Sequence, residues 1–162
     1  MNGGAKYASF VEQELKAERA RRGTLDGRGQ AVVTTSGALV ALLSAVGAIV
    51  INRKGFVLPA VARYPLFSAL SFFVIATFFG ILVTINFKYE VASKETLSKL
   101  RGHWADSDNV AMRNIVATNV MTIATLRRGN DKKATLLFVA LFAQLGALLS
   151  LAVTVFLAIR VG

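Results

Sequence analysis

The residues best suited to chemistry in this chain lie in a polar stretch between residues 88 and 133. The single histidine, His103, stands beside the single tryptophan, Trp104. The nearby acids are Glu90, Glu95, Asp106 and Asp108, for which surface pairing or helix capping is a sufficient explanation. The chain has no cysteine, no metal-ligand spacing, no Ser-His-Asp order and no phosphate-loop or dinucleotide fingerprint. We therefore expect no enzymatic activity, no metal site and no bound cofactor.

Three apolar blocks without a single charged residue determine the expected fold class. They span residues 29–52, 64–87 and 134–159 of a chain that is 54% hydrophobic. Because about 20 apolar residues in a helix cross a bilayer, each block is long enough. The sequence predicts an all-α membrane protein with three transmembrane helices and a cytosolic helical segment between the second and third. The uncharged blocks argue against an ion-coupled transporter and against a channel with charged rings.

Two basic, turn-prone stretches precede the first and third blocks. They read "RRGTLDGRGQAVV" at residues 21–33 and "LRRGNDKKATLLF" at residues 126–138. Gly23, Gly27 and Gly29 predict a loosened junction before the first block, and the Gly129-Asn130 pair predicts a turn before the third.

The distribution of lysine and arginine predicts how the chain is oriented. Bases predominate before the first and third blocks and after the second, and they are enriched on the cytoplasmic side of membranes. We expect a cytosolic N-terminus and an external C-terminus. The net charge of +10 is then mainly an orientation and headgroup signal. We expect no nucleic acid partner, because basic and aromatic residues do not alternate.

The polar parts of the chain carry helix signals of their own. Ser9 and Glu12 fit a capping box that opens a helix, Glu12 and Lys16 stand at a spacing that favours an ion pair, and Asp106 or Ser107 suits the start of a later helix. That later helix has an apolar stripe made of Met112, Ile115, Val116, Asn119, Ile123 and Leu126. We expect the stripe to pack on other cytosolic helices, a second subunit or the membrane surface. The expected division is a cytosolic helix and collar at 1–29, a transmembrane hairpin at 30–87, a cytosolic segment at 88–133 and the third span at 134–162.

The chain resembles the transmembrane effectors of the bacterial Pycsar antiphage system in the order of its parts. A short helix leads to a basic collar with "LDGRGQAV", followed by two spans, a helical segment that ends in "LRRGNDKKA" and a last span. The chain is also similar to small actinobacterial membrane proteins labelled as plasmid-transfer proteins. The first resemblance implies a multi-pass protein of the bacterial inner (cell) membrane. A partner nucleotide cyclase would make a cyclic pyrimidine nucleotide, cCMP or cUMP, and the effector would then impair the membrane and cause abortive infection.

The resemblance also implies a ligand site, and the apolar stripe favours a homo-oligomer. A cyclic nucleotide carries a phosphate that arginine can bind in bidentate fashion, and a base that can stack on an aromatic ring. The candidate ligand-binding residues are Arg101, Trp104, Arg113, Arg127 and Arg128. The second resemblance leaves an alternative open: a pore-forming or structural membrane protein for plasmid transfer, without a nucleotide ligand.

Overall fold

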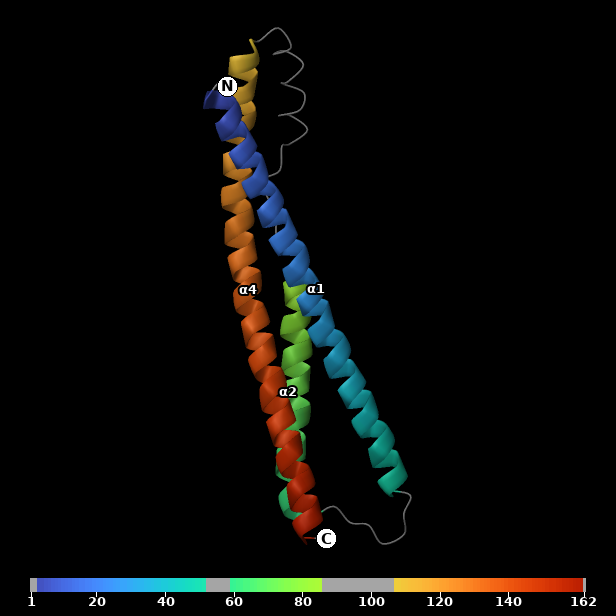
Figure 1. Ribbon diagram of the computed structural model, residues 1–162. Helices are drawn as coiled ribbons and strands as arrows, with labels where there is room; N and C mark the ends of the chain where they lie inside the picture. The colour runs from blue at the N-terminus through green and yellow to red at the C-terminus, as the bar shows by residue number, and fades with distance from the viewer. Residues whose placement is uncertain (1–2, 52–58, 86–106, 162) are drawn as a thin grey trace. The chain divides into compact units, whose positions relative to one another are not determined.

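The computed structural model describes residues 3–51, 59–85 and 107–161, and these are almost entirely helical (Figure 1). Helix α1 spans Gly3–Ile51, α2 spans Ala60–Thr84 and α4 spans Asp108–Val161. The all-α prediction is confirmed for this part of the chain. By length and composition, α2 and α4 can each cross a membrane. The first predicted span, at residues 29–52, and the cytosolic location of the segment between the second and third spans remain predictions.

Both predicted breaks before the apolar blocks are wrong. Helix α1 continues through Gly23, Gly27 and Gly29, and α4 continues through Gly129 and Asn130. Glycine costs a helix only about 1 kcal/mol relative to alanine. Packing against a neighbouring helix outweighs that cost, since Gly29, Gly129 and Asn130 are all buried.

The predicted helix starts had mixed outcomes. The capping box at Ser9 is wrong, because α1 begins at Gly3 and Ser9 lies inside it. The predicted start at Ser107 agrees with the structure, in which α4 begins at Asp108, and the alternative, Asp106, lies outside the described residues. The backbone carbonyl of Ser107 accepts hydrogen bonds from the amides of Val110 and Ala111.

The chain forms two compact units, and α1 and α4 contribute to each. Unit 1 contains the described residues 3–24 and 107–132, and unit 2 contains 25–51, 59–85 and 133–161. In unit 1, Leu15 of α1 is buried with Ile123 and Leu126 of α4. A Cβ atom at Gly4 would lie 3.5 Å from Sδ of Met112, and Asn130 donates a hydrogen bond to Glu18, so the two helix segments run parallel there.

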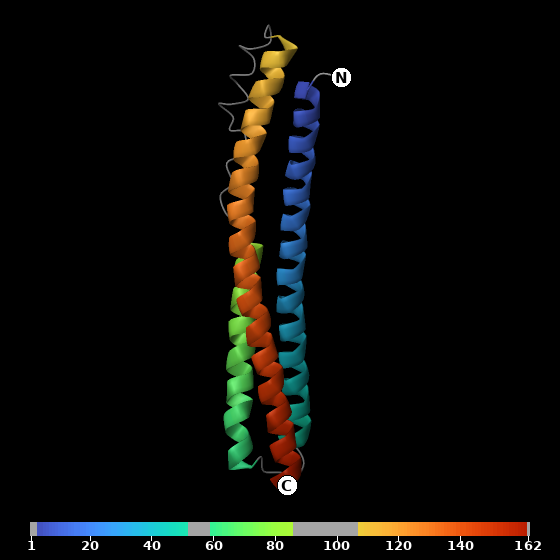
Figure 2. The same cartoon turned by 60° about the vertical axis from the view of Figure 1, so that its left-hand side comes forward.

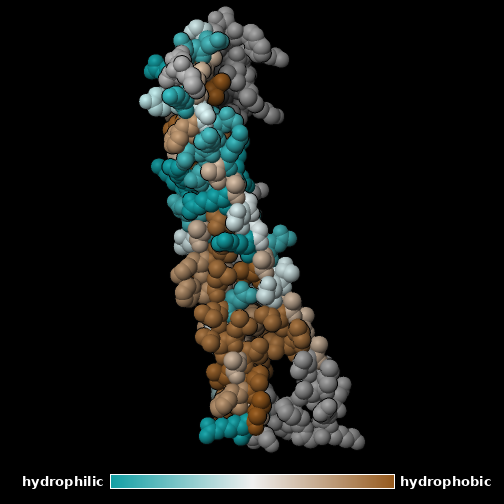
Figure 3. All heavy atoms as spheres, viewed as in Figure 1, coloured by the Kyte–Doolittle hydropathy of each residue, from teal (hydrophilic) through white to brown (hydrophobic). Residues whose placement is uncertain are grey.

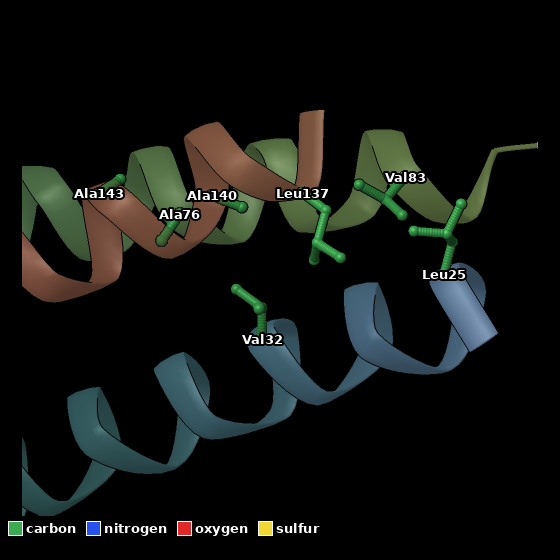
Figure 4. Packing of buried hydrophobic residues seen from close by; sticks show 7 residues of the cluster. All are labelled: Leu25, Val32, Ala76, Val83, Leu137, Ala140 and Ala143. Carbon is green, nitrogen blue, oxygen red and sulfur yellow. The ribbon is translucent and has the colours of Figure 1, made fainter. Parts of the chain in front are cut away.

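The core of unit 2 consists of small and medium apolar side chains from α1, α2 and α4 (Figure 4). It contains Leu25, Val32, Ala76, Val83, Leu137, Ala140 and Ala143. The buried side of α2 carries Ala62, Ala69, Ala76 and Gly80 at spacings of seven and four, and such small residues let helices approach closely. Within unit 2, α2 lies alongside α4 in both ribbon views (Figure 2), and Ser68 and Ser150 are in contact between them.

Helices α1 and α2 approach each other closely in unit 2 at two glycines. A Cβ atom at Gly29 would lie 2.8 Å from Cγ1 of Val83 and 3.1 Å from the carbonyl oxygen of Gly80. A Cβ atom at Gly80 would lie 2.9 Å from Cγ2 of Val33. Gly29 therefore serves helix packing rather than loosening a junction.

The outward side of unit 2 carries large apolar side chains, so its visible face is predominantly hydrophobic (Figure 3). On α2 these include Phe67, Val74 and Phe78, and on α4 they include Phe138, Phe142, Leu149 and Phe156. All of these side chains are more than half exposed within the chain. Small residues therefore face inward and bulky apolar residues outward, as expected for helices surrounded by lipid.

Candidate functional site

The strongest concentration of polar contacts lies in unit 1, between α1 and α4, and we call it the polar seam. Arg127 of α4 is its principal base. Its Nε donates to Oε1 of Glu18 at 2.9 Å, and its Nη2 donates to Oε2 of Glu14 at 2.5 Å. Glu14 and Glu18 lie four residues apart, on one face of α1. The hydrogen bond that Arg127 donates to Glu18 raises the pKa of the Arg127 guanidinium above its usual value, with smaller contributions from the charges of Glu18 and Glu14.

The centre of the polar seam is the buried pair Glu18 and Asn130. The Asn130 amide nitrogen donates to the Glu18 carbonyl oxygen at 3.0 Å and to its Oε2 at 2.9 Å. Asn130 is fully buried and Glu18 is 8% exposed. Glu18 thus accepts hydrogen bonds from two side chains of α4, which satisfies a charge that would otherwise be costly to bury.

Two further features complete the polar seam. Arg21 of α1 pairs with Asp131 of α4 at 2.9 Å and approaches Glu18 at 3.8 Å. The Oδ1 atom of Asn130 is buried and has no hydrogen-bond partner among the described residues. Rotating the amide to use that oxygen would place it against the two oxygens of Glu18, so Asn130 holds its orientation through its nitrogen.

Unit 2 holds a separate ion pair between the same two helices. The Lys133 side chain is fully buried and donates to the Asp26 carboxylate. Lys133 stands directly before the apolar block at 134–159, and Leu137, one turn later, belongs to the apolar core. Removing one partner of a buried pair leaves the other charge uncompensated, so the pair restricts how α1 and α4 can be aligned.

The predicted ligand-binding residues do not form one site in the described structure. Arg101 and Trp104 lie outside the described residues. Arg113, Arg127 and Arg128 are all on α4. At 1.5 Å per residue, Arg113 lies about 21 Å along the helix from Arg127. Arg127 and Arg128 are both exposed, but only Arg127 pairs with carboxylates among the described residues.

The described residues that line a surface groove in unit 1 include no base for a phosphate. The groove lies between the starts of α1 and α4 and is lined by Ala8, Glu12, Asp108, Ala111, Met112, Ile115, Val116 and Asn119. Four members of the predicted apolar stripe therefore line an open surface, whereas Ile123 and Leu126 pack on Leu15. Carboxylates at the groove would repel an anion.

Sequence reasoning missed the two acids that bind Arg127 and the Asn130 amide that donates to one of them, Glu18. The predicted pair of Glu12 and Lys16 is confirmed at 2.9 Å. Glu14 has no basic residue four positions later, as Glu12 has in Lys16. Glu18 forms its contact with Arg127 across the two helices rather than along its own helix. A signal was available in spacing, because Leu15 and Glu18, like Leu126, Asn130 and Lys133, follow the three-four rhythm of a helix-helix seam.

Comparison with known proteins identifies no relative of this chain: no family model, no curated protein and no solved structure matches it.

Proposed function

We propose that this chain is a membrane effector of an antiphage defence system, activated by a cyclic pyrimidine nucleotide, cCMP or cUMP, from a partner cyclase. The activated protein would impair the bacterial inner membrane and cause abortive infection. The resemblance described above supplies the ligand and partner. One structural observation carries the rest. Helices α1 and α4 both contribute to a unit held by the polar seam and to a unit whose outward surface is apolar.

The exposed surface of unit 2 supports a bilayer as its surroundings. Its large apolar side chains include Phe67, Phe78, Phe142 and Phe156, each at least 57% exposed. Contiguous apolar surface of this kind is unfavourable in water, at roughly 25 cal/mol per Å², and costs nothing among lipid tails.

The polar seam supports a response to an anion. Arg127 is 51% exposed at its side chain, and its Nη2 is bound by Glu14, whose own side chain is 36% exposed. A phosphate is a strong bidentate acceptor for a guanidinium. In the proposed mechanism the nucleotide phosphate displaces Glu14 from Arg127 and weakens the link between α1 and α4.

The second candidate, a pore-forming or structural protein for plasmid transfer, has one specific observation in its favour. Arg127 already has two carboxylate partners, and such a base can serve structure alone. Under that function the polar seam would be a fixed helix clamp. A homo-oligomer is compatible with both candidates, because several chains can act together in either function.

Calorimetry on the purified full chain in detergent separates the two candidates. Under the proposed function cCMP or cUMP binds, Arg127→Gln abolishes the binding, and Glu14→Gln strengthens it because a competing carboxylate is gone. Glu12→Gln is the matched control, since Glu12 is an exposed acid on the same helix that pairs only with Lys16 among the described residues. A wild-type protein that binds neither nucleotide refutes the nucleotide-gated function. A neighbouring cyclase gene would favour the first candidate, and conjugation genes the second.

A further inference from the structure

Two bases of α4 have no acidic partner among the described residues, although acids lie close by in the sequence. Arg128 and Lys132 are both exposed. The acids on either side of the polar seam are already engaged, Glu14 and Glu18 by Arg127 and Asp131 by Arg21. The charges of Arg128 and Lys132 are therefore not balanced within this part of unit 1.

The two bases share one face of α4. They stand four residues apart, a spacing at which side chains are neighbours and like charges repel. The residues of α4 that face α1 are Leu126, Asn130 and Lys133, all buried, and the two bases alternate with them. The pair therefore faces away from α1, and no acid among the described residues compensates its charge there.

The exposed residues of α4 that follow Arg128 and Lys132 indicate which kind of anion would bind to this pair. Thr135, one turn after Lys132, is exposed and polar, and the exposed positions that continue the three-four spacing beyond it include Val139, Phe142 and Leu149, all apolar. The outward face thus changes from basic to apolar within about two turns. A phospholipid presents the same order, a phosphate followed by hydrocarbon, whereas a free nucleotide has no apolar tail to match the second part.

We propose that Arg128 and Lys132 form a binding site for the phosphate of an anionic phospholipid headgroup. The inference rests on the membrane placement proposed above and needs no nucleotide. It also assigns different roles to two adjacent arginines. Arg127 points into the polar seam and links α1 to α4, and Arg128 points outward and anchors α4 at the membrane surface.

Native mass spectrometry of the full chain in detergent tests this site with two lipids, phosphatidylglycerol and phosphatidylcholine. The wild type should bind phosphatidylglycerol more tightly. Arg128→Gln with Lys132→Gln should weaken phosphatidylglycerol binding by about 30-fold, from the attraction typical of two surface bases, and leave phosphatidylcholine binding unchanged. The charge-retaining variant Arg128→Lys with Lys132→Arg should keep the preference.

The control variant Lys6→Gln with Arg19→Gln removes the same charge from exposed positions of α1. An equal loss in that control would mean net charge alone acts, and it would overturn the site. So would an unchanged preference in the double glutamine variant, or displacement of phosphatidylglycerol by cCMP, which would assign the face to a free nucleotide. If the double glutamine variant loses its helical circular dichroism, the test uses the wild type alone at increasing salt concentration. A wild-type preference for phosphatidylglycerol that does not weaken with salt would overturn the proposal.

Discussion

At the residue level, Glu18 and Asn130 define the polar seam. Each is buried, and each lies at a position where an apolar residue would continue the packing of Leu15 and Leu126. A buried asparagine in a helix pair commonly fixes register at a cost in stability. Its amide reaches both the backbone and the side chain of Glu18, so shifting either helix by one turn breaks both hydrogen bonds.

Substitution of Asn130 should reveal how the amide supports the buried carboxylate. Asn130→Ala removes two donors from Glu18 and should lower the free energy of unfolding by about 1–3 kcal/mol. Asn130→Asp should cost more at neutral pH, because it places a second carboxylate against Glu18. The excess should shrink as the pH falls toward about 4, where carboxyl groups protonate. Thermal unfolding in detergent across this pH range measures both effects.

Asn114→Asp is the matched control, an exposed asparagine on the same helix. It should leave the midpoint of unfolding nearly unchanged. Equal effects at positions 114 and 130 would contradict the role given to Asn130.

At the level of helices, the sequence predicted which residues are helical better than it predicted where helices end. The apolar blocks and the stripe beginning at Met112 are local patterns, and they identified helical segments correctly. Gly129-Asn130 is also local, but its outcome depends on Glu18, more than 100 residues away along the chain. The partners of Arg127, Glu14 and Glu18, are similarly distant in sequence. They could not be predicted, because pairing between two parallel helices depends on the register of the helices.

The crossing of α1 and α2 predicts opposite effects for two neighbouring glycines. Gly29→Ala should destabilise the protein by about 1–3 kcal/mol, because the added methyl group meets Val83 and the backbone of Gly80. Gly27→Ala has open space around it and should stabilise α1 by up to about 1 kcal/mol. Thermal unfolding of the two variants in one detergent compares them directly. A Gly29→Ala protein as stable as Gly27→Ala would contradict the close crossing.

At the level of the whole molecule, the flanking bases predict an external C-terminus. Arg160 is the only base after the third apolar block, whereas Arg127, Arg128, Lys132 and Lys133 precede it. An alkaline phosphatase fused to the C-terminus should be active, and a green fluorescent protein at the same place should be dark. The reverse pair of results would contradict the proposed orientation.

In the proposed function, a nucleotide that binds at Arg127 controls whether the apolar helices impair the membrane. The most direct test of this function is dye release from vesicles that contain the purified full chain. We predict that cCMP or cUMP triggers release from wild-type vesicles and that Arg127→Gln abolishes this response. Release that is absent with both nucleotides, or that is identical with and without them, would contradict the account.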